Sequence, residues 1–128
     1  MHKTTQQQLG SKGEQLAAAF LIKNGHRIIQ QNFRSGRSEL DIISVFGQTI
    51  VISEVKSYFS PPLGAAELRV HKHKQRQLIQ GAYAFLDQHE AYSGMDVRFD
   101  VIIVDFSKYP AKITIHEGAF WDEDTWLA

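Results

Sequence analysis

The chain has 128 residues, 43% of them hydrophobic and 22% charged, and its 14 basic and 14 acidic side chains give a formal net charge of zero. This composition predicts one globular domain with a buried core and argues against a strongly electrostatic, non-specific nucleic-acid binder, although a local basic patch is allowed. The absence of cysteine excludes disulfides and thiolate chemistry.

We expect residues 1–128 to form a single cytoplasmic domain without a membrane partner, because the sequence has no signal-peptide-like start and no apolar run of membrane-spanning length. Residues 1–9 are polar and are expected to be flexible. Ser11 and Glu14 then have the spacing of a capping box, which predicts a helix that ends near Asn24, before Gly25. Helix capping is therefore one interpretation of Glu14.

A strand and a basic loop follow this helix. Residues 26–33 are predicted to form the first strand, and residues 34–38 form a short loop with two arginines. Arg34 and Arg37 could clamp a phosphate through paired hydrogen bonds, or they could be ordinary solvated loop charges.

Residues 38–58 predict a β-hairpin. Two runs rich in β-branched residues flank Gly47-Gln48, and glycine at the first turn position suits a tight type II′ turn. With a two-residue loop Phe46 faces Thr49, and the rest of the register follows from that pair. A bulged, three-residue loop would change the register.

The predicted register brings four charged side chains to one face of the hairpin, with Asp41 opposite Glu54 and Glu39 opposite Lys56. Two carboxylates this close repel each other unless they share a proton or bind a cation. Magnesium prefers such oxygen ligands, and the ammonium group of Lys56 would orient a water or stabilise developing negative charge. The alternative is a solvated strand with a Glu39–Lys56 ion pair.

The second half of the chain predicts a proline-containing loop over residues 57–64, a long helix over residues 66–89, and strands over residues 96–106 and 112–116. The apolar stripe of the helix is Leu78, Ile79, Ala82, Phe85 and Leu86. Its first half is the most basic stretch of the chain, and it could meet a nucleic-acid backbone or be a solvated helix end. The tail, residues 120–128, mixes aromatic and acidic side chains and could pack on the sheet or contact a partner.

The order of helix, three strands, helix and two strands predicts an α/β sandwich, in which a central mixed sheet carries helices on its faces. The pattern of Asp41 and Glu54-Val55-Lys56 resembles the PD-(D/E)xK motif of restriction-endonuclease-like nucleases. Over about residues 10–120 the chain resembles the YraN-like family of small bacterial proteins, which is assigned to that fold and is similar to Holliday-junction resolvases. The matching stretches are Gly13-Glu14, Asn32-Phe33-Arg34, Glu39-Leu40-Asp41, Glu54-Val55-Lys56, Lys74-Gln75-Arg76 and Arg98-Phe99-Asp100.

The resemblance implies a restriction-endonuclease-like three-layer sandwich and a divalent-metal-dependent nuclease that hydrolyses phosphodiester bonds of DNA with Mg²⁺ or Mn²⁺. It implies that Asp41 and Glu54 hold the metal, with Glu39 beside them, that Lys56 positions or activates the attacking water, and that Glu14 reaches the acidic set from its helix. The nucleic-acid-binding candidates are Arg34, Arg37, Tyr58, Lys74 and Gln75. The resemblance also allows a homodimer, since many nucleases of this fold pair to cut two strands.

Tyr58 stands where members of the family commonly have an arginine, two residues past the lysine. A phenol can hydrogen-bond a phosphate or stack on a base but cannot neutralise charge, and it can equally pack against the protein. Two alternatives to an enzyme therefore remain. One is a non-catalytic nucleic-acid-binding module on the same scaffold, and the other is a protein-interaction domain that uses the acidic and aromatic tail.

Overall fold

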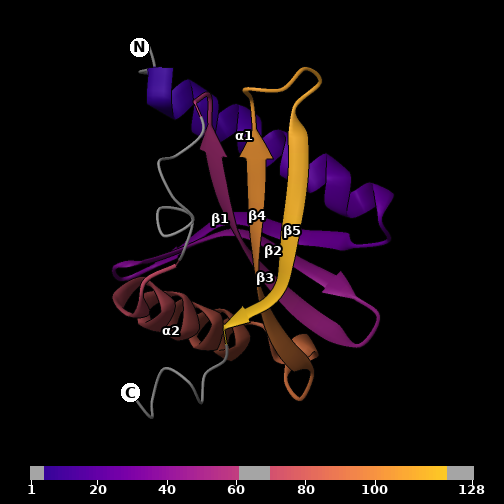
Figure 1. Ribbon diagram of the computed structural model, residues 1–128. Helices are drawn as coiled ribbons and strands as arrows, with labels where there is room; N and C mark the ends of the chain where they lie inside the picture. The colour runs from indigo at the N-terminus through magenta and orange to yellow at the C-terminus, as the bar shows by residue number, and fades with distance from the viewer. Residues whose placement is uncertain (1–4, 61–69, 121–128) are drawn as a thin grey trace.

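In the computed structural model, which describes residues 5–60 and 70–120, a five-stranded sheet lies between two helices (Figure 1). The elements are α1 (Thr5–Lys23), β1 (Arg27–Ser35), β2 (Ser38–Phe46), β3 (Thr49–Tyr58), α2 (Lys72–Gln88), the short 3-10 helix η2 (Glu90–Tyr92), β4 (Asp96–Asp105) and β5 (Lys112–Phe120). The strands lie in the order β1-β2-β3-β4-β5, and β3–β4 is the parallel pair. The predicted three-layer α/β fold, which is that of restriction-endonuclease-like proteins, is confirmed.

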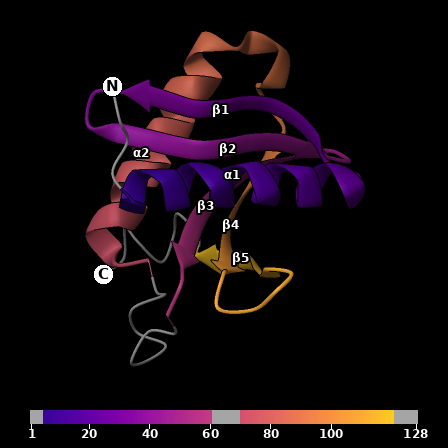
Figure 2. The same ribbon diagram turned by 90° about the horizontal axis from the view of Figure 1, so that it is seen from above.

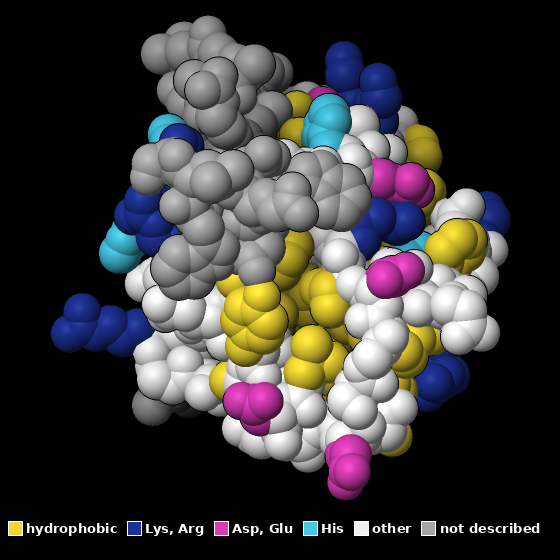
Figure 3. Space-filling view, turned by 90° about the horizontal axis from the view of Figure 1, so that it is seen from below, with side chains coloured by type: hydrophobic (Ala, Val, Ile, Leu, Met, Phe, Trp, Pro, Cys, Tyr) yellow, Lys and Arg dark blue, Asp and Glu magenta, His cyan; other side chains and the backbone are white. Residues whose placement is uncertain are grey.

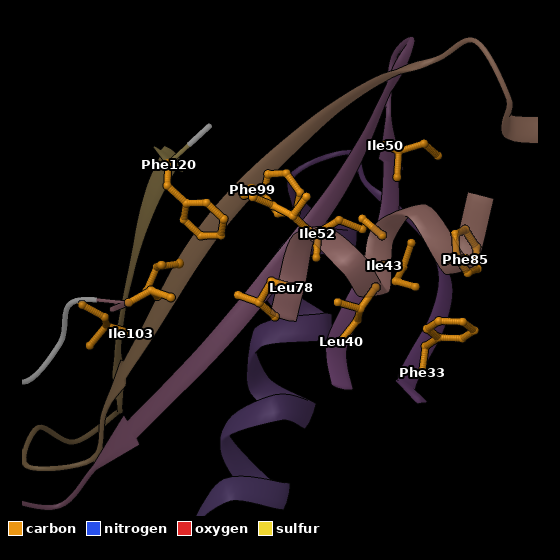
Figure 4. Close-up of a cluster of buried hydrophobic side chains, with 14 residues drawn as sticks. Phe33, Leu40, Ile43, Ile50, Ile52, Leu78, Phe85, Phe99, Ile103 and Phe120 are labelled. Carbon is orange, nitrogen blue, oxygen red and sulfur yellow. The ribbon is translucent and has the colours of Figure 1, made fainter. Parts of the chain in front are cut away.

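Each helix covers its own face of the sheet, as the view from above shows (Figure 2). Small residues of α1, Ala17 and Ala18, pack with Leu21 against Ile42 and Ile102 on one face. The predicted apolar stripe of α2 packs on the opposite face, where it joins the larger core cluster (Figure 4). That cluster includes Phe33, Leu40, Ile43, Ile50, Ile52, Leu78, Phe85, Phe99, Ile103 and Phe120.

The start of α1 differs from the prediction. The helix begins at Thr5, so Ser11 and Glu14 lie inside it and the predicted capping box is wrong. Residues 5–9, which were expected to be flexible, are helical, and residues 1–4 lie outside the described residues. The predicted end is confirmed, because Gly25 has a φ of +93° and the backbone N–H of His26 donates to the Leu21 carbonyl at 2.9 Å.

Two element boundaries in the second half of the chain also differ from the prediction. Val70 and His71 are not helical, so α2 begins at Lys72 rather than near residue 66. β5 continues to Phe120, four residues beyond the predicted end of its strand. Residues 61–69, which include the second half of the predicted proline loop, and residues 121–128 of the acidic and aromatic tail lie outside the described part of the chain.

Among residues 5–60 and 70–120, no helix combines the length and the apolar character needed to cross a membrane. Seen from below, apolar side chains reach the surface in one central area (Figure 3). Basic side chains and histidines gather along the left edge of this view, on the side where the first half of α2 lies (Figures 1 and 3). The exposed basic residues and histidines there are His71, which precedes α2, and Lys72, His73 and Arg76 within it.

Candidate functional site

The β2–β3 hairpin forms with the predicted turn and register. Gly47 has a φ of +60°, as the first position of a type II′ turn requires, and Phe46 pairs with Thr49. The paired residues continue in this register as far as Ile42 and Ser53.

Beyond Ile42 and Ser53 the ladder between β2 and β3 stops. The backbone N–H of Val55 donates at 2.9 Å to Oδ2 of Asp41, so a side-chain carboxylate takes the acceptor role that a backbone carbonyl of the neighbouring strand has in a regular ladder. The predicted ladder pairs Asp41–Glu54 and Glu39–Lys56 are therefore not formed. Glu39 pairs instead with Arg34 of β1, and their side chains form an ion pair at 3.5 Å.

Strand β2 also twists at this point. Leu40 packs in the core under α2, whereas Ile42 packs in the core under α1. Residues two apart on a regular strand share one face, so the alternation is broken at Asp41. We call this opening the fork, and define it by Asp41 on β2 and by Glu54 and Val55 on β3.

The carboxyl groups of Asp41 and Glu54 meet at the fork even though the two residues are not a ladder pair. Burial, followed by the charge of Asp41, raises the pKa of Glu54 to about 7. Burial also raises the pKa of Asp41, while a hydrogen bond with the Glu54 side chain and the bond from Val55 oppose that rise. Oε2 of Glu54 is buried and has no hydrogen-bond donor. The pair therefore favours one shared proton or one bound cation over two free negative charges.

Two lysines lie close enough to stabilise negative charge at the fork. Lys74 of α2 lowers the pKa of both Asp41 and Glu54, and Lys56 of β3 lowers that of Glu54, although burial outweighs both effects. Lys56 lies two residues after Glu54 on a regular part of β3, so the predicted common face of these two side chains is confirmed.

Glu14 approaches the fork from the opposite layer. Burial, and then the charges of Asp41 and Glu39, raise its pKa, while a hydrogen bond from the Asn32 side chain lowers it. Because Glu14 lies well inside α1, the capping interpretation is excluded. The structure thus brings together Glu14, Glu39, Asp41, Glu54, Lys56 and Lys74, from both helices and two strands.

The other nucleic-acid-binding candidates lie around this cluster or beside it. Arg34, with 76% of its side chain exposed, and the exposed Arg37 flank the turn between β1 and β2. Gln75 of α2 donates a side-chain hydrogen bond to the Val70 carbonyl at 2.8 Å, which secures the chain where it enters the helix. Tyr58 is half-buried at the end of β3, and its hydroxyl hydrogen-bonds the Asp105 side chain.

Sequence analysis assigned no role to two residues that shape the site, Gly13 and Asn32. A Cβ atom on Gly13 would lie 1.9 Å from Oγ and 3.0 Å from Cβ of Ser57, so α1 rests directly on β3 at this glycine. This close approach places the next residue, Glu14, near the fork. A glycine inside a helical stretch, where it weakens the helix, is the signal that could have identified it.

Replacing Gly13 with valine is expected to push α1 away from β3. The branched side chain would overlap Ser57, and overpacking of this kind costs about 1–3 kcal/mol of unfolding free energy. Thermal unfolding measures the loss. Gly10→Val is the matched control, since no atom lies within 4 Å of a Cβ built on Gly10. Equal stability of the two variants would contradict this account of Gly13.

The donor atoms at the fork suit a hard divalent cation. Two carboxyl groups share the site, and one of their oxygens, Oε2 of Glu54, is buried without a partner. Within the described residues no group of three or more histidine, aspartate or glutamate side chains is placed to hold a metal ion, so the protein would supply at most two such ligands at the fork. Magnesium is commonly held in this incomplete way, by one or two carboxylates with waters and substrate phosphate as its other ligands.

Comparison with known proteins gives one consistent result. Residues 13–104 match the model of the uncharacterised protein family UPF0102. A UPF0102 protein of Geobacter metallireducens is 38% identical over 112 residues, covering 88% of this chain and 91% of that protein. A UPF0102 protein of Chloroherpeton thalassium is 38% identical over 117 residues, covering 90% of each chain. The predicted resemblance therefore holds over most of the chain, and the matched segment contains the whole of the fork.

Proposed function

This chain belongs to the uncharacterised protein family UPF0102, and we propose that it is a divalent-metal-dependent nuclease acting on DNA. The family name assigns no activity, so the proposal is based on the chemistry of the fork. The observation that carries this proposal is the shared Asp41–Glu54 carboxyl pair, with Oε2 of Glu54 buried and lacking a donor. Two ionised carboxylates are costly to keep buried together unless a cation balances their charge or one of them takes up a proton.

In this proposal Asp41 and Glu54 would hold Mg²⁺ or Mn²⁺, and Glu39 or Glu14 would add negative charge beside them. The ion would supply Lewis acidity and would lower the pKa of a bound water. Its charge would also offset the repulsion between the two carboxylates. The bond from the Val55 amide holds Oδ2 of Asp41 in place, so this ligand would be oriented before the ion arrives.

The lysines would act on the phosphodiester. The Lys56 ammonium shares a face with Glu54 and would orient the attacking water or stabilise negative charge as the bond from phosphorus to the leaving oxygen breaks. Lys74 would approach from α2 on the same side of the sheet. Arg34, Arg37 and the exposed basic residues of α2 would contact phosphates farther along the strand, which positions the backbone without selecting a sequence.

Magnesium titration is the direct test of the proposed site. The wild-type protein is expected to bind magnesium saturably in a calorimetric titration, and Asp41→Asn is expected to weaken the binding at least tenfold because it removes one of two ligand charges. Manganese should give the same ranking.

Asp87→Asn serves as the matched control, since Asp87 is exposed on α2 at a distance in sequence from the site. It should bind magnesium as the wild type does. Identical titrations for the wild type and Asp41→Asn would place any bound ion elsewhere and remove the support for this proposal.

One observation favours a second candidate, a nucleic-acid-binding module without catalysis. Tyr58 stands where an arginine is common in the family, and its hydroxyl is engaged by Asp105, so a cation expected beside the lysine is missing. Binding of branched or single-stranded DNA without turnover in either magnesium or manganese would select this function over the nuclease.

A further inference from the structure

Asn32 has the most unusual backbone of the described strands. Among residues 5–60 and 70–120 it is the one non-glycine residue with a positive φ, at +54°. This left-handed conformation is uncommon outside glycine, asparagine and aspartate, and within a strand it bends the chain as a bulge does and redirects neighbouring side chains. The backbone of β1 is therefore irregular at Asn32.

The irregularity lies directly across from Asp41. The β1–β2 ladder pairs Gln31 with Ile42 and, in the same register, Phe33 with Leu40, but it skips Asn32 and Asp41 between them. Asp41 is unpaired on its other side as well, because the β2–β3 ladder ends at Ile42. A residue released from both neighbours can turn its side chain into the sheet, where the Asp41 carboxylate accepts the Val55 N–H.

The side chain of Asn32 acts on a second acid. Burial and the charges of Asp41 and Glu39 raise the pKa of the Glu14 carboxyl, and the nearby Asn32 amide lowers it. Asn32 is also exposed, so this contact lies at the solvent side of the cluster. One residue thus contacts the acid from α1 through its side chain and borders the acid of β2 through its backbone.

We infer that Asn32 is the positioning residue of the acidic site: its left-handed backbone releases Asp41 from the β1 ladder, and its side-chain amide holds Glu14 beside Asp41. The importance of Asn32 for catalysis rests on the proposed nuclease function. The placement of Asp41 and Glu14 by Asn32 does not depend on that function and can be measured separately.

Two variants distinguish the role of the Asn32 backbone from the role of its side chain. Asn32→Gly keeps the left-handed conformation at little cost but lacks the amide, whereas Asn32→Val lacks the amide and also opposes the conformation. Hydrogen exchange at the Val55 amide reports whether Asp41 still accepts its hydrogen bond. We expect wild-type protection in Asn32→Gly and at least tenfold faster exchange in Asn32→Val. Equal exchange in both variants would overturn the role of the backbone. If Asn32→Val does not fold, Asn32→Ala replaces it in the same comparison.

The side-chain contact is tested by NMR and by magnesium binding. In the wild type the side-chain amide resonances of Asn32 are expected to shift when Glu14 is replaced by glutamine, and unchanged resonances would overturn the contact. Asn32→Gly is expected to weaken magnesium binding by about 10- to 100-fold, as the loss of a residue that orients metal ligands does, with an unchanged melting temperature. In the Glu14→Ala background Asn32→Gly should have little further effect on magnesium binding, because Glu14→Ala has already removed the contact between these two side chains.

These outcomes distinguish the inference from the proposed function. A wild-type protein that binds no magnesium would remove the nuclease proposal, while the Val55 exchange and the Asn32 resonances would still decide how the acids are placed. Normal magnesium binding by Asn32→Gly, with wild-type binding intact, would overturn the positioning role alone.

Discussion

Replacing Glu54 with glutamine is expected to abolish the proposed metal-dependent cleavage and, in the ion-free protein at pH 8, to raise the free energy of unfolding. The pKa of Glu54 rises from its ordinary value of 4.5 to about 7 in the folded protein, so the folded state holds this proton more tightly than the unfolded state does. The resulting stabilisation is complete below pH 4.5 and is lost as the pH rises to about 7. Above pH 7 the buried charge costs about 3 kcal/mol, and glutamine avoids this cost.

Chemical unfolding of the two proteins between pH 4.5 and 8 measures this difference. The unfolding free energy of Glu54→Gln should be close to that of the wild type at pH 4.5 and should exceed it by as much as about 3 kcal/mol at pH 8. Saturating magnesium should narrow the difference, because an ion bound to the folded wild type stabilises that protein and not the variant. Glu90→Gln changes an exposed glutamate on η2 and serves as the control. A difference in unfolding free energy that does not depend on pH would show that folding does not raise the pKa of Glu54.

Replacing Asp100 with alanine is expected to lower the free energy of unfolding by about 3–5 kcal/mol, the usual cost of breaking a buried ion pair by removing one partner. Asp100 is 1% exposed on β4, and its two carboxylate oxygens accept hydrogen bonds at 2.9 Å from Nε and an Nη atom of Arg98. Oδ1 also accepts the backbone N–H of Gly118 on β5 at 3.0 Å. Alanine would leave the half-buried Arg98 side chain with only the exposed Glu117 as an ion-pair partner, and it would leave the Gly118 N–H without this acceptor.

Thermal or chemical unfolding tests this expectation. Asp87→Ala, an exposed aspartate on α2, should change stability by less than about 0.5 kcal/mol. If Asp100→Ala fails to fold, Asp100→Asn retains the shape and one acceptor oxygen and should show a smaller loss. A stability equal to that of Asp87→Ala would contradict the role given to this carboxylate in joining β4 to β5.

Local sequence patterns predicted the hairpin and the buried face of α2 because neighbouring residues determine turn type, strand pairing and helix amphipathicity. Gly47 sets the hairpin turn, and the β-branched runs on each side set its register down to Ile42 and Ser53. The stripe that begins at Leu78 faces the core as predicted. The capping box failed because Ser11 and Glu14 can have that spacing anywhere in a helix, and the preceding segment continues the helix back to Thr5.

The geometry of the site could be predicted only in part. Spacing along β3 placed Glu54 and Lys56 on one face, since neither residue interrupts the strand. The position of Asp41 was beyond such reasoning because it depends on the Val55 amide of a neighbouring strand and on the backbone of Asn32. Glu39 turns to Arg34 rather than Lys56 for the same reason, since the ladder that would have paired it with Lys56 has already ended.

The irregular course of β1 also bears on how the protein avoids aggregation. β1 is an outer strand of the sheet, and an outer strand with an unbroken row of backbone N–H and C=O groups is a template on which another chain can add a strand. The register of β1 shifts between Ile28 and Gln30, and its backbone turns left-handed at Asn32. These two interruptions leave only short regular runs, so the outer edge of β1 is poorly suited to accept a strand from a second molecule.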